Sequence, residues 1–497
     1  MIKNITSHSL QLIIALFFFC NQTSGQNQNI SQGILFDGEP YIMCKPSNSE
    51  HIVILWMGYS FGQNIGILSK TTFDGGTTWS IATTLPHLGS SYKSADPSLA
   101  FDTNGDLFAC YVDFKQDPDS GAVVLSKSID GGLTWNIHSQ AIDAYDDGLK
   151  LPIDRPWLRI NPINNHFYIT TKPAPWIPAP NRPYFIASLD GGLNWQPWKY
   201  LDAPGFLSGN FIEGPMAAFD VGSDGIFHTF YPTYVFSQNI LPGFIHASSA
   251  NSGETFSYNG GFYAASNGGE PSAKSGYTLR INPTDPQHLA FVFTTKLLND
   301  LDIYLVESLD GGINWSSSLR VNDDTPNNGI TQDLPWLSFN EEGALAIAWR
   351  DRRNSLIDGY AAPTSIWIAI RPAGAGSFLP NTEISDVDAP YIEIYQESSG
   401  NDFMSLDYKG DILNSAWADV RNNILEIWFD RRTIDGGVLV REVIASEVLP
   451  EVQIFPNPAK DVIQIIGKEL LFLRVFDTTA KEILAKQITG NIEINIS

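Results

Sequence analysis

Acidic residues recur at one position of a repeated sequence pattern, directly before short apolar segments. They are Glu39, Asp96, Asp154 with Arg155, Glu213, Asp333 and Asp402; the fifth copy, with Lys274 and Ser275, lacks an acid. Crowded carboxylates raise one another's pKa and can hold a proton at neutral pH, as pairs of general acids and bases do. The same oxygens could hold a hard cation such as calcium. A structural interpretation stays open, because a repeated acid can also cap a repeated turn.

Basic and aromatic residues accompany these acids. Segments 349–353, 417–421 and 428–432 share the spacing Trp-x-Asp-x-Arg, which places all three side chains on one side of a strand. Such a pair could contact a ligand or brace neighbouring repeats. Trp176 follows several prolines and could stack on a sugar ring or pack on its own loop. The candidate catalytic residues are Asp96, Arg155, Glu213, Asp333 and Asp402; the candidate ligand-binding residues are Glu39, Asp154, Trp176, Arg353 and Arg421.

A repeated phrase predicts the element that positions these residues. The phrase Asp-Gly-Gly, then one residue, then Thr-Trp or Asn-Trp begins at Asp74, Asp130, Asp190 and Asp310. An altered copy, Asn-Ser-Gly-Glu-Thr-Phe, begins at Asn251. A fixed period of about 60 residues indicates one supersecondary unit that is stacked many times. Each copy predicts four short strands, the fourth beginning at the Thr-Trp or Asn-Trp of the phrase, so residues 33–448 are expected to form an all-β propeller. We count seven blades, with six or eight as the alternatives, because the N-terminal strand could complete the last blade.

The phrase resembles the Asp box, or BNR repeat, of sialidases and related propellers. The resemblance implies a sialidase-like propeller in which the boxes are structural: Asp74, Trp79, Asp130, Trp135, Asp190, Trp195, Asp310 and Trp315. Strand alternation places these boxes on the face opposite the acids. In sialidases three arginines bind the sialate carboxylate, a Tyr–Glu pair supplies the nucleophile and an Asp is the acid/base.

A strict sialidase mechanism is not expected from this sequence. The order Asp96, Glu213, Arg280, Arg353, Tyr391 is compatible with that family. However, no arginine precedes Arg155, whereas the family's first arginine lies before its first Asp box. Arg280 also occupies the same repeat position as Arg159, which indicates a scaffold residue.

Both ends of the chain carry export signals. Lys3, the apolar run 10–20 and the small residues 23–25 predict a signal peptide that is cleaved after Gly25. Residues 449–497, with Phe-Pro-Asn-Pro at 455–458, resemble the type IX secretion C-terminal sorting domain of Bacteroidota. The glycine usual before Lys481 is missing and the expected final strands are absent, so this domain is expected to be incomplete. Secretion or display on the outer cell surface follows, with the type IX machinery as a partner and no transmembrane span.

Composition narrows the partners further. A net charge of -24 excludes nucleic acid, whose phosphates require a basic surface. After signal cleavage Cys44 and Cys110 remain, as one disulfide or as two buried thiols. We expect a monomer that requires no cofactor, with calcium as the metal the acids could hold.

Three functions remain open. The first is a propeller that binds an extracellular glycan or glycoprotein through the face that carries the acids. The second is a glycoside hydrolase, sialidase-like or other, that uses rim carboxylates. The third is a structural or adhesion propeller.

Overall fold

The computed structural model describes two compact units, residues 1–441 and 442–497. In the first unit it describes residues 27–33, 35–59, 64–115, 121–143, 153–173, 182–205, 216–233, 243–263, 276–357, 359–393 and 401–435. In the second it describes five strands: β29 (Gln453–Phe455), β30 (Val462–Ile466) and β33 (Ile492–Asn495) form one sheet, and β31 (Leu470–Phe476) pairs with β32 (Glu482–Thr489). Within these segments no helix is long and apolar enough to cross a membrane.

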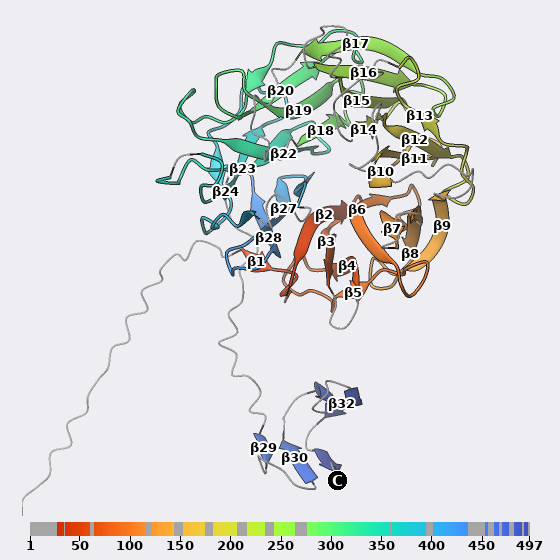
Figure 1. Cartoon of the computed structure of the whole chain (residues 1–497), viewed down its shortest axis with the longest axis vertical. Coiled ribbons are helices and arrows are strands. Elements are labelled where there is room, and N and C mark those ends of the chain that lie inside the picture. The colour runs from red at the N-terminus through yellow and green to blue at the C-terminus, as the bar shows by residue number, and fades with distance from the viewer. Residues whose placement is uncertain are drawn as a thin grey trace, which may run out of the picture. The chain divides into compact units, whose positions relative to one another are not determined.

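The first unit is a seven-bladed propeller of four-stranded antiparallel sheets, as predicted (Figure 1). Blades one to three are β2 (Asp37–Lys45), β3 (Asn48–Tyr59), β4 (Ile65–Thr72), β5 (Thr83–Thr84); β6 (Lys93–Phe101), β7 (Leu107–Phe114), β8 (Gly121–Ser128), β9 (Asn136–Asp143); and β10 (Ile153–Ile160), β11 (Phe167–Pro173), β12 (Tyr184–Ser188), β13 (Lys199–Tyr200). Blades four and five are β14 (Ala218–Val221), β15 (Phe227–Thr233), β16 (Gly243–Ser249), β17 (Ser257–Tyr263); and β18 (Tyr277–Ile281), β19 (Leu289–Thr295), β20 (Asp302–Ser308), β21 (Leu319–Arg320). Blades six and seven are β22 (Gln332–Phe339), β23 (Leu345–Asp351), β24 (Ser365–Arg371), β25 (Thr382–Glu383); and β26 (Ser405–Lys409), β27 (Ile412–Asp419), β28 (Glu426–Thr433), β1 (Gln28–Asn29).

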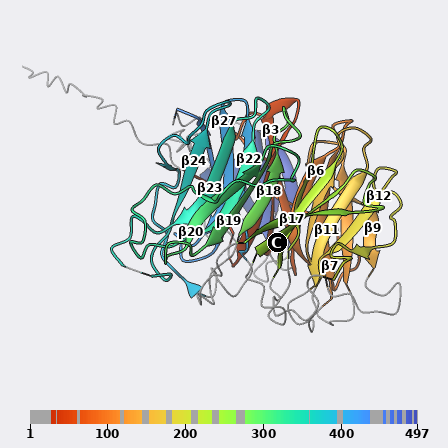
Figure 2. The ribbon, with the colours of Figure 1, turned by 90° about the horizontal axis from the view of Figure 1, so that it is seen from above.

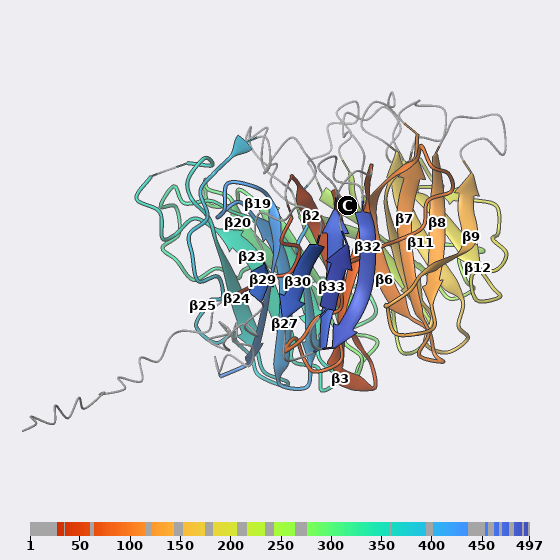
Figure 3. The ribbon, with the colours of Figure 1, turned by 90° about the horizontal axis from the view of Figure 1, so that it is seen from below.

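The first strand of each blade lies on the inside of the ring. Contacts join the first strands of successive blades from β2 round to β26 and back to β2. These strands therefore line a central channel, and the strands of each blade run between its two ends (Figures 2 and 3). We call the end where the first strands begin the upper mouth and the end where they finish the lower mouth.

The N-terminal segment closes the ring. β1 is the outermost strand of blade seven and pairs antiparallel with β28. Asn27 links this segment to blade six, because its side-chain amide donates to the Ile384 carbonyl, just after β25, at 2.9 Å. Ile30 is 1% exposed within the hydrophobic core. Two segments of the propeller that are far apart in sequence, β1 and β26 to β28, thus complete one blade.

The repeated Asp-Gly-Gly phrase forms the turn between the third and fourth strands at the lower end of five blades. In the second copy, the Thr134 N–H and hydroxyl donate to Asp130 at 2.9 and 2.6 Å, and the Ser128 hydroxyl donates at 2.8 Å. In the third, hydrogen bonds from the Asn194 backbone and side chain lower the pKa of Asp190 to about 2. These carboxylates are acceptors that shape a turn, which suits a structural role.

An Asp130→Ala variant is expected to lose about 1–2 kcal/mol of unfolding free energy, because the turn donors lose their acceptor. Asp130→Asn is the matched control and should be nearly neutral. The fourth-blade analogue of that control already exists in the chain: Asn251 accepts from the Thr255 N–H and donates to its hydroxyl. Chemical denaturation of the two variants would measure the difference, and equal losses would contradict this account.

A shared irregularity occupies the upper part of four first strands. Glu39, Asp96, Arg155 and Leu334 each precede a proline and have φ between 49° and 56°, and the strand register shifts at these points. Left-handed backbone is rare for residues other than glycine. The position predicted for the acids is therefore corrected: Glu39, Asp96, Asp154 and Asp333 lie within the first strands at β-bulges, not in the connection before them. A bulge re-aims side chains at the rim of a closed sheet.

Two other predictions are refined by the structure. The fourth strands were expected to begin at the Trp of each box, but β5, β13 and β21 start several residues later and contain two residues each. Cys44 and Cys110 are free thiols, both buried in the sheets. Of the two interpretations of these cysteines, the structure shows the buried thiols.

Candidate functional site

An ion pair crosses the channel at the upper mouth. Arg155, in β10 of blade three, pairs with Asp402, which lies just before β26 of blade seven. The two blades are not neighbours, so the pair must span the channel. About a fifth of each side chain is exposed, 22% for Arg155 and 17% for Asp402, which leaves the pair accessible from the mouth.

Two carboxyl groups lie beside this pair and share a hydrogen bond. Asp96 comes from the bulge of β6 and Asp154 from the bulge of β10. The Arg155 N–H donates to Asp96 Oδ2 at 3.2 Å, and Lys172 Nζ lies 2.6 Å from Asp154 Oδ2. Together with Glu39, whose charge acts on Asp96, these groups form what we call the upper ring: Glu39, Asp96, Asp154, Arg155, Lys172 and Asp402.

The surroundings separate the pKa values of the two aspartates. Burial, followed by the negative charges of Glu39 and Asp154, raises the pKa of Asp96 well above its ordinary value. Burial opposes ionisation of Asp154 too, but the cations Lys172 and Arg155 lower its pKa overall. The surroundings therefore favour the protonated form of Asp96 beside the ionised form of Asp154, with the proton of Asp96 in the hydrogen bond between them. Two carboxyl groups whose pKa values are moved apart in this way are typical of acid and base pairs.

An aromatic layer lies below the upper ring. Trp336 in β22 contacts Tyr41, Trp157 and Phe403 with ring centroids 5.6, 5.7 and 6.1 Å apart. These side chains come from blades one, three, six and seven, so they meet across the channel. They give the upper ring an apolar floor of the kind that carbohydrate-binding and other small-molecule sites use.

Asp333 lies in a different network. It accepts two hydrogen bonds from Arg350, at 2.7 and 2.5 Å, and one from the Tyr360 hydroxyl at 2.6 Å. Arg352 adds a second cation, and Asp333 is 0% exposed. Burial opposes ionisation, but the two arginines lower the pKa of Asp333 far below its usual range. This arrangement is a buried brace within blade six.

Arg353 and Arg421 occupy matching positions in blades six and seven. Arg353 pairs with Asp351 and stacks on Trp367 at 4.0 Å; Arg421 pairs with Asp419 and stacks on Trp428 at 3.9 Å. Both side chains are largely covered, with 11% and 5% exposed. Their geometry agrees with the bracing alternative given by the repeated spacing.

The structure thus brings together five of the predicted residues: Glu39, Asp96, Asp154, Arg155 and Asp402. Glu213 and Trp176 lie outside the residues that the structure describes. Sequence reasoning missed Lys172, although it stands at the end of a second strand directly before the proline-rich segment that holds Trp176. Across the described segments, no group of three or more His, Cys, Asp or Glu side chains is arranged to hold a metal ion. The calcium hypothesis stays a prediction.

Raising the pH is expected to destabilise the native chain more than an Asp96→Asn variant. The raised folded-state pKa of Asp96 means that the folded chain keeps a proton that the unfolded chain, with an Asp pKa near 3.9, has lost. This contribution to stability is fully present below about pH 3.9 and is lost as the pH rises through the folded-state pKa. Asparagine carries no such proton, so its unfolding free energy should vary less with pH. Urea titrations between about pH 4 and pH 8 would measure both slopes, and identical slopes would contradict a protonated Asp96.

Comparisons with known proteins agree with the two-unit architecture. Residues 453–497 match the family model described as a secretion system C-terminal sorting domain. This confirms the predicted sorting domain and with it type IX export to the cell surface or the medium. No curated protein matches the chain in sequence.

Solved structures share the propeller fold at low sequence identity. An ulvan lyase of a polysaccharide lyase family is 8% identical with a TM-score of 0.51, over 84% of this chain and 98% of that one. A protein of unknown function from Dyadobacter fermentans is 14% identical with a TM-score of 0.48, over 70% and 96%. The Hadza microbial sialidase is 13% identical with a TM-score of 0.45, over 76% and 75%. At such identities the likeness concerns the fold alone.

Proposed function

We propose that this exported propeller binds an extracellular glycan at its upper ring. The observation that carries the proposal is the convergence of charged groups from blades one, two, three and seven at one end of the channel. Sugar hydroxyls both donate and accept hydrogen bonds, and the upper ring offers both kinds of partner. The Arg155 guanidinium donates in a fixed plane, the ionised Asp154 accepts, and the Asp96 oxygen that does not carry the shared proton accepts as well.

Hydrolysis of that glycan is the second candidate function, favoured by the raised pKa of Asp96, which suits a general acid. Glycoside hydrolases place their two carboxyl groups about 5 to 9.5 Å apart. Asp96 and Asp154 share a hydrogen bond and are closer than that. In a hydrolase Asp96 would therefore be the acid, and the second carboxylate would be Asp402, Glu39 or Glu213. A structural or adhesion role would need none of these protonation states.

Purified protein should be screened against sialyl, arabinosyl and plant or algal glycans for both binding and sugar release. Binding without release is the expected result. Release that disappears in a folded Asp96→Asn variant would establish the hydrolase instead. Absence of any glycan binding by the native protein would leave the adhesion role as the better account.

A further inference from the structure

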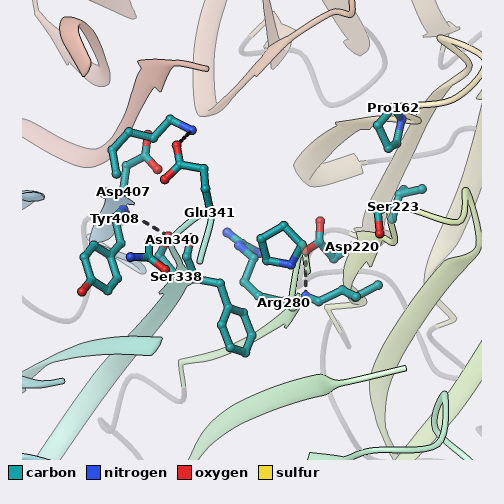
Figure 4. Close-up of a pocket in the computed structure, with 14 residues that line it drawn as sticks. Pro162, Asp220, Ser223, Arg280, Ser338, Asn340, Glu341, Asp407 and Tyr408 are labelled. Carbon is teal, nitrogen blue, oxygen red and sulfur yellow. Dashed lines mark hydrogen bonds and ion pairs between the residues drawn. The ribbon is translucent and has the colours of Figure 1, made fainter. Parts of the chain in front are cut away.

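A cavity lies at the lower mouth, below the aromatic layer. Its volume is about 340 Å³, and it is lined by the ends of β14, β18, β22 and β26 and the turns that follow them (Figure 4). It is separate from the upper ring. The first strands separate the cavity from the upper mouth. In β22, for example, Ser338 of the cavity wall lies roughly 16 Å along the strand from Asp333 at its upper end, at 3.3 Å per residue.

Arg280 is the distinctive residue of this cavity. Its guanidinium donates to the carbonyl of Leu279 at 2.8 Å and lies 5.3 Å from the ring of Trp336. Among the residues that the structure describes, no carboxylate lies within ion-pair distance of it. Arg159 has the same place in the repeat but pairs with Asp220 and donates to the Tyr41 hydroxyl at 2.7 Å. Arg159 and Arg280 occupy the same position of the repeat but differ in their partners, since of the two only Arg159 forms an ion pair, with Asp220, among the described residues.

The acids in the wall of the cavity are already engaged. Asp220 accepts from the Ile281 N–H at 3.0 Å in addition to its pair with Arg159, and Glu341 pairs with Lys409. Asp407 accepts from the Cys44 N–H at 2.5 Å. Burial raises the pKa of Asp407, which weakens its tendency to carry a charge. Among the described residues, Arg280 is thus the wall cation without a direct ion pair, although Asp220 and Asp407 act on its charge from a longer distance.

The protonation of Arg280 agrees with this picture. Burial, followed by the like charge of Arg159, lowers the pKa of Arg280 to about 10, against the opposite effects of Tyr41, Asp220 and Asp407. The group still carries its charge at neutral pH, in surroundings that favour the arrival of an anion. In the view of Figure 4 the Arg280 side chain lies between Asp220 and Asn340.

We propose that the lower mouth binds a small organic carboxylate, with Arg280 as the recognising residue and Trp336 as the surface beneath the guanidinium. A planar carboxylate matches the guanidinium fork with two parallel hydrogen bonds. A cavity of about 340 Å³ suits a ligand no larger than one acidic sugar. This site is independent of the glycan site proposed at the upper ring.

Calorimetric titration of the purified protein with sodium glucuronate tests the proposal, with glucose as the uncharged probe of similar size and sodium sulfate as the non-carboxylate anion. Glucuronate is expected to bind the native protein, and Arg280→Gln to weaken that binding at least tenfold. Arg371→Gln is the matched control: it removes a cation that is paired with Glu307 outside the cavity lining, and it should change the affinity less than threefold. Glucose and sulfate should bind at least tenfold more weakly than glucuronate.

Several results would overturn the proposal. They are no glucuronate binding by the native protein, equal binding of glucose, equal Arg280-dependent binding of sulfate, or unchanged binding by Arg280→Gln. If Arg280→Gln does not fold, Arg280→Lys keeps the charge but loses the fork, and native affinity in that variant would also overturn it. Asp154→Asn separates the two sites, because it should keep glucuronate binding; loss there would place the binding at the upper ring instead.

Discussion

Removal of residues 26–31 from the mature chain is expected to lower the free energy of unfolding by about 5 kcal/mol. Burial of Ile30 contributes about 2–3 kcal/mol and each lost hydrogen bond about 1 kcal/mol. The bonds concerned include Asn27 to Ile384, Ile30 to the Ile427 carbonyl at 2.8 Å, and the Trp79 indole to Gln28 at 2.9 Å. The deletion also leaves β28 as an unpaired edge.

Thermal and urea unfolding of chains that begin at Gln26 and at Gln32 would measure this loss. Ile30→Val is a graded control within the same segment, with an expected loss of about 1 kcal/mol. A shorter chain that unfolds like the longer one would show that β1 does not close the ring.

Replacement of Arg155 with Ala is expected to cost about 3 kcal/mol of stability and to weaken glycan binding at least tenfold. The side chain supplies the cation that faces Asp402 across the channel and that acts on both Asp96 and Asp154. Removing one partner of a largely buried ion pair leaves the other charge poorly compensated. The pKa of Asp96 would then rise further, since Arg155 is the cation that lowers it.

A double-mutant cycle with Asp402→Asn separates the cross-channel pair from the rest of this loss. Denaturation of the two single variants and the double variant should give a coupling energy of at least about 1 kcal/mol. Arg353→Ala is the control for function, because its braced side chain lies outside the upper ring and glycan affinity should be retained. Additive effects of Arg155→Ala and Asp402→Asn would contradict the pair across the channel.

The propeller could be predicted because its information is local and repeated. Each copy carries the Gly-Gly turn, whose glycines adopt positive φ, as Gly131 and Gly132 do at 79° and 98°. The same copies predicted seven blades, which the structure confirms, and the placement of boxes and acids at opposite ends of the blades. The closing role of β1 was only an alternative, since a two-residue strand carries almost no pattern and its partner β28 is at the far end of the propeller.

The upper ring could be predicted in part. The repeated sequence position predicted Glu39, Asp96, Asp154, Arg155 and Asp402 as site residues. It predicted Asp333 in the same way, and the structure is needed to show that Asp333 belongs to a buried brace and not to the upper ring. The positive φ of Glu39, Asp96 and Arg155, which sets the direction of their side chains, could not be predicted because these residue types do not favour left-handed backbone. The pairing of Arg155 with Asp402 depends on ring closure, which brings together residues from blades three and seven. Similarly, Arg159 and Arg280 have identical local sequence, and their different partners come from other blades.

The most direct test of glycan binding at the upper ring is the dissociation constant of the best-binding glycan for the native protein, Asp154→Asn and Asp130→Asn. Both variants replace one Asp by Asn, one at the upper ring and one in a turn at the lower end. With melting temperatures near native, we expect Asp154→Asn to bind at least tenfold more weakly and Asp130→Asn to bind as the native protein does. Equal affinity of all three proteins would contradict the assignment of the glycan to the upper ring.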